Sequence, residues 1–204
     1  SDSIIVAATI AQYQFTGNNC TTSVLNVTAQ PTNAAFSNYM IAGSTLVCTA
    51  VNDVVNYSGW NTSATIDTTQ YYGFSIVPDT CYGMNLTQLL FTHRISNSGA
   101  GVVIHLRSSL DGYATDFHTI TAPTPNTFIN EVINLPVAFS TVYTPITFKF
   151  FATSMGATGA TYRHDNVSVK GFINQLGTTT FYADVDGDGF GNATASIVNC
   201  VPPV

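Results

Sequence analysis

Three aspartates at every second position near the carboxyl end have the spacing best suited to chemistry. Asp184, Asp186 and Asp188 alternate with Val or Gly, and further glycines come after them. In an extended strand this spacing would place like charges on one face, whereas in a loop turned by glycines it directs them inward around a hard cation. Ca²⁺ takes about six to eight oxygen ligands from carboxylates, amide side chains and backbone carbonyls. The spacing therefore predicts a Ca²⁺-binding loop, to which the Phe190 carbonyl and the Asn192 side chain add oxygens.

The loop departs from an EF-hand at its last position. An EF-hand closes with a bidentate glutamate at about the twelfth position of the loop, and here that position is Ala195. The alternative to a metal site is a solvated acidic turn.

A second set of residues has the chemistry to bind a sugar. Trp60 is the single tryptophan, and if exposed it could stack on a sugar ring, with Tyr57, Tyr71 and Tyr72 widening the platform. The alternative, which we favour for Trp60, is that it packs a loop onto the domain.

The arginines are conspicuous because the chain has only five Lys and Arg residues. Arg94 and Arg107 have two interpretations: contact with a sugar or carboxylate on an exposed sheet face, or an ion pair across strands. We favour the ion pair, with Asp116 as the nearest candidate in the sequence.

Catalytic machinery is not apparent in the sequence. The four His have no Ser or Cys nucleophile beside them in a defensible motif. Glu131 is the only glutamate, so the paired carboxylates of a glycosidase are hard to find. We therefore expect a protein that is not an enzyme.

The elements that must position these residues are predicted to be strands. Runs of β-branched and aromatic residues are bounded by Gly, Asn, Asp or Pro, and we find no convincing helical period. The predicted strands cover residues 4–15, 34–41, 54–57, 70–77, 85–96, 101–110, 117–121, 127–135, 144–153 and 161–172. Roughly ten strands with regular turn signals predict an all-β jelly roll or β-sandwich. We assign it to residues 1–173, with a linker and calcium-binding segment at 174–204.

Two turns in this pattern predict strand pairing. Residues 85–96 and 101–110 alternate most clearly and are joined by the Gly- and Ser-containing sequence 96–101, so we expect them to form a pair. Asp111-Gly112 is the strongest hairpin signal in the chain, with the strand 117–121 after it.

The composition excludes some partners and indicates a location. Charged residues make up 8% of the chain and the net charge is −6. No basic stripe is present to neutralise the phosphates of a nucleic acid, and an anionic membrane is disfavoured for the same reason. No apolar run approaches the ~20 residues of a spanning helix, so we expect no membrane insertion. A surface covered by Ser, Thr and Asn is typical of secreted bacterial surface proteins.

The four cysteines also point outside the cytosol. None forms a CxxC pair, so disulfides are more plausible than zinc ligands. We favour Cys20–Cys48, since both lie in Thr-rich loop sequence near the first strands, and leave Cys81 and Cys200 either paired or free.

The tail resembles a known calcium repeat. Phe181 to Gly191 is similar to the YADxDGDGFG repeats of secreted Bacteroidetes proteins, relatives of thrombospondin type 3 repeats, and Cys200-Val201-Pro202 matches the cysteine and proline that come shortly after such a repeat. Sequences within the larger part resemble a jelly-roll module of large secreted Bacteroidetes surface proteins. They are residues 15–20, 58–62, 91–96, 107–113 and 162–167. The resemblance implies an extracellular, non-catalytic module of an adhesin or fibre.

The resemblance implies further sites. In related jelly rolls, an aspartate at the start of the last strand helps to hold a structural Ca²⁺ between the first and last strands, a role that would fall to Asp165 with backbone oxygens near residues 12–14. The alternative is that Asp165 caps a turn or pairs with Arg163. The O-glycosylation pattern of the same bacteria matches at Ser3 and Thr68.

We therefore expect a secreted, calcium-binding structural and adhesive module of a cell-surface or fibre-forming protein. One alternative is a carbohydrate-binding module of a larger secreted hydrolase, with surface glycans as its partner. Another is a filament subunit that pairs with itself by strand exchange, for which Ile4 to Phe15 is the candidate donor strand.

Overall fold

The computed structural model describes residues 7–96, 101–121, 123–184, 187, 191–192 and 194–200. Strands dominate this part of the chain, and its two short helices are 3-10 turns, η1 (Ser109–Asp111) and η2 (Val137–Phe139). In the described residues no helix has the length and apolar character needed to cross a membrane.

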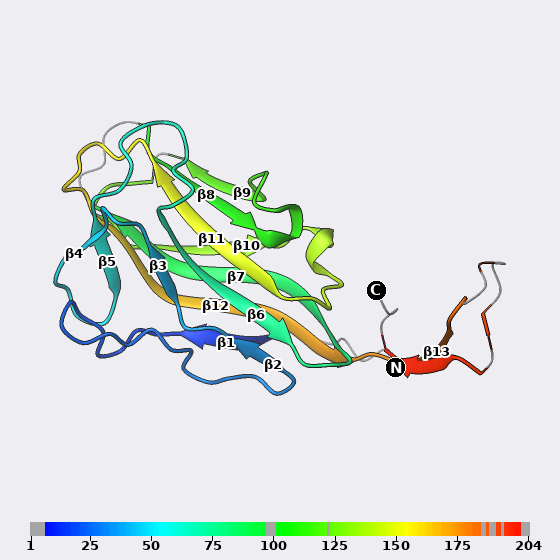
Figure 1. Ribbon diagram of the computed structural model, residues 1–204. Coiled ribbons are helices and arrows are strands. Elements are labelled where there is room, and N and C mark those ends of the chain that lie inside the picture. The colour runs from blue at the N-terminus through cyan, green and yellow to red at the C-terminus, as the bar shows by residue number, and fades with distance from the viewer. Residues whose placement is uncertain are drawn as a thin grey trace, which may run out of the picture.

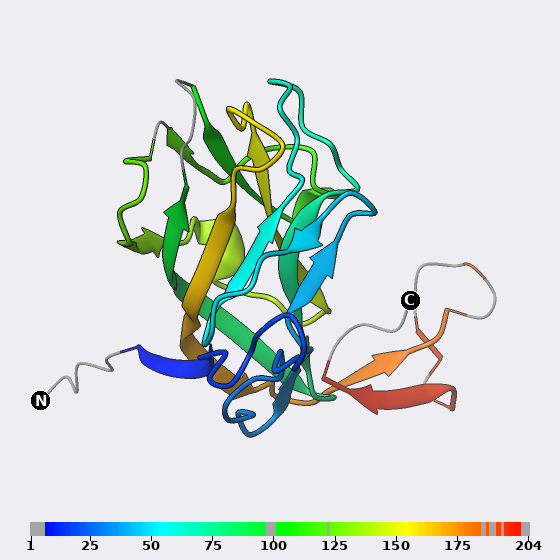
Figure 2. The same ribbon diagram turned by 90° about the vertical axis from the view of Figure 1, so that its left-hand side faces the viewer.

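Two antiparallel six-stranded sheets form a β-sandwich (Figures 1 and 2). One sheet has the order β10 (Ile129–Asn134), β7 (Tyr82–Ile95), β12 (Tyr162–Gln175), β5 (Val55–Ser58) and β4 (Val47–Cys48), with β1 (Ala8–Tyr13) also paired to β12. The other has the order β2 (Ala34–Phe36), β6 (Tyr71–Pro78), β11 (Ile146–Thr153), β8 (Val103–Ser108) and β9 (His118–Thr121), with β3 (Met40–Ala42) paired to β6. We call them the β7 sheet and the β11 sheet. The all-β sandwich predicted from the sequence is confirmed.

The core between the sheets is strongly aromatic. Phe91 of β7 meets Phe150 of β11 with ring centroids 5.1 Å apart, and Tyr72 of β6 stacks on Tyr162 of β12 at 5.3 Å. The alternation of apolar residues predicted in β7, β8 and β11 is confirmed, because their inward side chains are buried. Each sheet therefore has one apolar face in the core and a second face directed outward.

The pairing expected between residues 85–96 and 101–110 is wrong. β7 pairs with β10 and β12, whereas β8 pairs with β9 and β11 in the opposite sheet. A chain that crosses from one sheet to the other buries the apolar faces of both strands just as well as a hairpin does, so alternation alone did not separate the two arrangements.

The hairpin expected at Asp111-Gly112 forms in part. β8 and β9 pair, but residues 109–117 make a wider connection that begins with η1. Gly112 (φ 67°) ends this helix in the left-handed conformation, so the Asp-Gly pair terminates a 3-10 turn rather than making a two-residue turn.

The last strands form a separate hairpin, β13 (Thr179–Tyr182) with β14 (Ser196–Asn199). It projects beyond the end of the sandwich (Figure 2). The Cys81–Cys200 disulfide ties it to the turn between β6 and β7.

Candidate functional site

The loop predicted to bind calcium lies between β13 and β14. Asp186, Asp188 and Phe190 are outside the described residues. The Asp184 carboxylate turns into the loop, where the Gly187 backbone N–H donates to its Oδ1 at 2.8 Å. The Asn192 side-chain oxygen accepts from the backbone N–H and hydroxyl of Thr194. The hairpin thus holds the two ends of the loop together, and the Ca²⁺ site stays a prediction.

Asp165 lies where β12 leaves regular pairing with β7. Its carboxylate accepts from the backbone N–H and the side-chain amide of Asn166, at 2.7 and 2.9 Å. Burial raises the pKa of Asp165, and the negative charge of Asp53 raises it further, against the lowering effect of the Asn166 N–H. No group of three or more His, Cys, Asp or Glu in the described residues is arranged to hold a metal, so calcium at Asp165 also stays a prediction.

Trp60 does not offer a stacking surface for sugar. It is 1% exposed, its Nε1–H donates to the Tyr57 carbonyl at 2.8 Å, and its ring packs edge-on against Tyr72 and Tyr162. Tyr57 is half-buried, also with its ring against Tyr72. The packing role favoured for Trp60 is the one that the structure shows.

The two arginines have different partners. Arg107 forms the expected ion pair, with Nε 2.6 Å from Asp116 Oδ1. Arg94 instead donates to Asn126 Oδ1 at 2.9 Å and lies over the Phe128 ring. Its predicted partner is therefore wrong, because Asp116 belongs to the connection between β8 and β9, in the opposite sheet.

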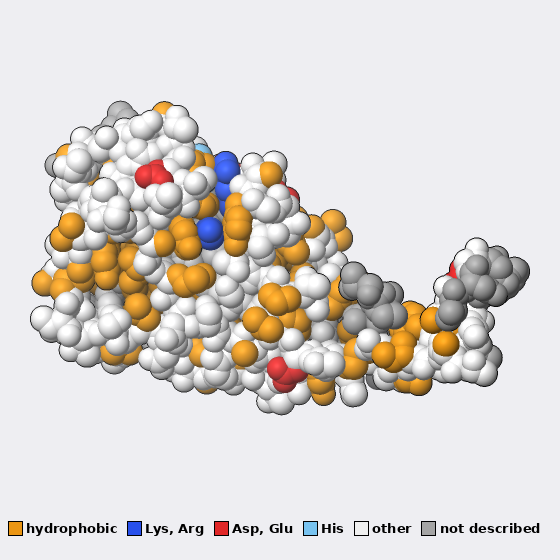
Figure 3. All heavy atoms as spheres, in the orientation of Figure 1, with side chains coloured by type: hydrophobic (Ala, Val, Ile, Leu, Met, Phe, Trp, Pro, Cys, Tyr) orange, Lys and Arg blue, Asp and Glu red, His pale blue; other side chains and the backbone are white. Residues whose placement is uncertain are grey.

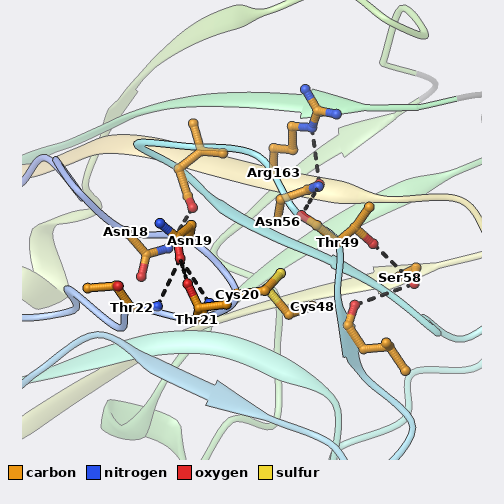
Figure 4. The surroundings of a disulfide bond; sticks show 12 residues. Asn18, Asn19, Cys20, Thr21, Thr22, Cys48, Thr49, Asn56, Ser58 and Arg163 are labelled. Carbon is orange, nitrogen blue, oxygen red and sulfur yellow. Dashed lines mark hydrogen bonds between the residues drawn. A yellow bond between two sulfur atoms is a disulfide. The ribbon is translucent and has the colours of Figure 1, made fainter.

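The Cys20–Cys48 disulfide is confirmed. It links the loop after β1 to β4, and Asn19 and the Thr residues beside Cys20 form a compact hydrogen-bonded turn around it (Figure 4). The pairing of Cys81 with Cys200, left open by the sequence, completes the set, so no described cysteine is free. Such cross-links persist outside reducing compartments.

Ser3 and Thr68 stay predicted glycosylation residues. Ser3 lies outside the described residues. Thr68 is exposed in the loop between β5 and β6, next to the Asp67 carboxylate that caps Thr69.

The outer face of the β11 sheet gathers charged and aromatic side chains that the sequence analysis did not bring together. Lys149 of β11 is paired in register with Arg107 of β8 and with Gly73 of β6. The side chains of Lys149 and Arg107 point outward, because their neighbours along each strand are buried. Gly73 has no side chain, which leaves room for the aliphatic stem of Lys149 beside it.

Two tyrosines enclose the Lys149 ammonium group. Its Nζ lies 4.0 Å from the centroid of the Tyr71 ring and 4.2 Å from that of Tyr113. Tyr71 begins β6, whereas Tyr113 comes from the connection between β8 and β9 and also accepts, through its carbonyl, from Arg107 Nη1 at 3.0 Å. A cation between two rings holds both rings in place.

The Arg107 end of this surface is fixed by a hydrogen-bonded chain. Asp116 accepts from Arg107 and bonds His105 Nδ1 at 2.7 Å, and His105 Nε2 lies 3.1 Å from Thr153 Oγ1. Burial alone would raise the pKa of Asp116, but the hydrogen bonds from Arg107 and His105 outweigh it and hold that pKa below its ordinary value. The carboxylate therefore stays ionised.

Together these residues line a hollow, which we call the Lys149 hollow: Tyr71, His105, Arg107, Tyr113, Asp116 and Lys149. Viewed from this side, Lys and Arg side chains lie in a depression bordered by hydrophobic ones, on a surface that carries little other charge (Figure 3). Its residues are half-buried, so each offers atoms to solvent. The signal in the sequence was Lys149 itself, a scarce cation at an outward position between Phe148 and Phe150.

No family model matches the chain, and no curated protein is similar to it in sequence. The fold is similar to solved structures. A carbohydrate-binding module of family 29 matches with a TM-score of 0.41 and 10% identity, covering 81% of this chain and 90% of that one. A Bacteroides thetaiotaomicron protein, for which sugar binding has been proposed, matches with 0.45 and 10%, covering 78% and 100%. The K1 cleaved adhesin domain of Lys-gingipain from Porphyromonas gingivalis matches with 0.36 and 11%, covering 78% and 95%.

Proposed function

We propose that the chain is a non-enzymatic, extracellular carbohydrate-binding module whose ligand, a glycan, lies in the Lys149 hollow. The observation that carries this proposal is the Lys149 ammonium group held between the rings of Tyr71 and Tyr113, beside Arg107. The proposal corresponds to the carbohydrate-binding alternative of the sequence analysis, and it places the sugar on other residues than Trp60.

The chemistry of the hollow suits a sugar. Glycan sites combine apolar and aromatic surface, which packs on the C–H face of a sugar ring, with a few fixed polar groups that bond its hydroxyls. Tyr71 and Tyr113 supply rings and hydroxyls, and Lys149 and Arg107 supply donors. Because the cation–π contacts and the Asp116 ion pair hold these groups before binding, little side-chain entropy is lost when a ligand arrives.

A glycan array and then titration calorimetry test this proposal. Tyr71→Ala and Tyr113→Ala should each weaken binding of the best glycan about tenfold, the equivalent of about 1.4 kcal/mol. Tyr143→Ala is the matched control, because Tyr143 is 50% exposed and lies outside the Lys149 hollow. Unchanged affinity in both hollow variants would remove the hollow from the binding site.

We also propose that the loop between β13 and β14 binds Ca²⁺ through Asp184, Asp186, Asp188, the Phe190 carbonyl and Asn192. The hydrogen bond from the Gly187 N–H to the Asp184 carboxylate and the pairing of β13 with β14 support this, and the alternating aspartates of the sequence supply the oxygen ligands that Ca²⁺ requires. Bound Ca²⁺ would stiffen the segment after the sandwich, as expected of a surface-protein module.

Limited proteolysis tests the calcium proposal. Chelation of Ca²⁺ should speed cleavage within residues 179–195 and leave the sandwich intact, because loss of the cation releases the loop. The variant that combines Asp186→Asn with Asp188→Asn should be cleaved as fast as the chelated wild-type chain, whether or not chelator is present. Equal cleavage of the unaltered chain in both conditions would contradict a calcium site.

A further inference from the structure

Two arginines lie on neighbouring strands at the outer face of the β7 sheet, on the opposite side of the sandwich from the Lys149 hollow. Arg94 of β7 and Arg163 of β12 are direct partners in the register of the two strands. Both are half-buried and point outward, because His93, Ile95, Tyr162 and His164 on either side of them are buried. The pair brings together two of the five Lys and Arg residues of the chain.

Each guanidinium is held by a neutral amide. Asn56 Oδ1 accepts from Arg163 Nε at 3.1 Å, and Asn56 is itself fixed by donating to the Thr49 carbonyl at 2.7 Å. Figure 4 shows the terminal nitrogens of Arg163 pointing away from Asn56. Asn126 Oδ1 accepts from Arg94 through one of its terminal nitrogens, Nη2, at 2.9 Å. These amides orient both groups without neutralising their charge.

No carboxylate in the described residues lies within ion-pair distance of Arg94 or Arg163. The nearest along β12 on the same face is Asp165, whose carboxylate accepts from Asn166 instead. Burial lowers the pKa of Arg163, and the charge of Arg94 lowers it further. Two like charges on paired strands repel each other when no carboxylate lies beside them, and bound anions would relieve that repulsion.

We propose that Arg94 and Arg163 bind the oxyanion of an acidic polysaccharide, either the carboxylate of a uronic acid or a sulfate ester. Planar guanidinium groups present paired donors that match both anions. This site goes beyond the proposed function, because it lies on the other sheet and selects for charge.

The surroundings favour a sugar chain over a protein carboxylate. Phe128, 53% exposed, lies under Arg94 and offers an apolar ring. From there a row of cross-strand hydrogen-bonded pairs continues along β7 and β10, Thr92 with Asn130 and Gln88 with Asn134. These side chains have the hydroxyl and amide chemistry that bonds sugar hydroxyls. The net charge of −6 opposes any polyanion, so we expect the attraction to be local.

Titration of the full chain with polygalacturonate, methyl-esterified polygalacturonate, dextran sulfate and neutral dextran tests the site. Wild-type protein should bind at least one of the two polyanions and neither neutral polymer at this face. Binding should weaken with salt, because the contact is ionic. Polygalacturonate alone would identify the carboxylate as the ligand, and dextran sulfate alone would identify the sulfate.

The decisive variant is Arg94→Gln combined with Arg163→Gln, which should weaken polyanion binding at least about tenfold. Lys170→Gln is the control, because it removes a positive charge farther along the same face of β12, and it should change binding less than about twofold. Arg94→Lys combined with Arg163→Lys keeps both charges and should retain part of the affinity, which excludes a folding defect as the cause. Wild-type affinity in the double Gln variant, or no binding of either polyanion by the wild type, would overturn the proposal.

The two glycan sites can fail separately. Tyr71→Ala should leave the polyanion titration unchanged, and the double Gln variant should leave the glycan of the Lys149 hollow bound.

Discussion

At the scale of single residues, His164 is an ionisable side chain that is fully buried in the core. Its Nδ1 lies 2.5 Å from the Tyr39 hydroxyl, and its Nε2 bonds the Tyr162 hydroxyl. Rings of Phe91 and Phe150 pack against it. Burial lowers the pKa of His164 well below its ordinary value, and the neighbouring His93 lowers it further. The folded protein therefore keeps this imidazole neutral.

This burial predicts a pH dependence of stability. The unfolded chain takes up a proton at His164 below about pH 6.5, while the folded chain does not. The free energy of unfolding should keep its full value above that pH. Below that pH it should fall by up to about 1.4 kcal/mol per pH unit. Urea unfolding between pH 7.5 and 4.5 measures how the free energy of unfolding changes with pH. His164→Gln should lower this slope by up to about 1.4 kcal/mol per pH unit, which corresponds to one proton. Tyr39→Phe is the control, because it should cost about 1 kcal/mol at every pH and keep the slope. An equal slope in His164→Gln and wild type would contradict this account.

At the scale of elements, β12 organises the β7 sheet. It pairs with β7 along its whole length, and its other edge is shared by β5 and then β1. The register shifts between Lys170 and Gly171, and a side chain at Gly171 would meet the Asn85 carbonyl at 2.2 Å. Close approach of two backbones at this irregularity requires glycine.

Gly171→Ala should therefore destabilise the sandwich by about 1–3 kcal/mol, because the added methyl group forces β12 away from β7. Urea unfolding at neutral pH gives the difference. Gly177→Ala serves as the control, since a methyl group there would meet nothing within 4 Å, and it should be nearly neutral. A loss of similar size in both variants would indicate a general effect of glycine replacement instead.

The sequence predicted which residues form strands better than it predicted which strands pair with each other. Alternation placed β7, β8 and β11 correctly because period-two burial is a local property of each strand. It could not say which sheet each strand joins, and so it misplaced the partner of Arg94. Tyr113 and Lys149 are far apart in the chain and meet only through the pairing of β8 with β11, so the Lys149 hollow had no local signal beyond a lone lysine among phenylalanines. The Cys20–Cys48 bond was predictable because both residues lie in Thr-containing sequence near the first strands, although Cys48 itself belongs to β4 rather than to a loop.

At the scale of the whole molecule, the sandwich presents two outer faces with different chemistry, and a disulfide-tethered hairpin carries the predicted calcium loop. The Lys149 hollow combines aromatic rings with fixed donors, whereas Arg94 and Arg163 present charge held by amides. The two proposed sites would therefore contact different glycans at opposite surfaces of the sandwich.

The most direct test of the Lys149 hollow is an amide NMR titration of the full chain with the best neutral oligosaccharide from the glycan array. We expect the largest shifts at Tyr71, Arg107, Tyr113 and Lys149, saturating together with one affinity. Shifts confined to the outer face of the β7 sheet, or no saturable shift with any glycan, would contradict the proposed function.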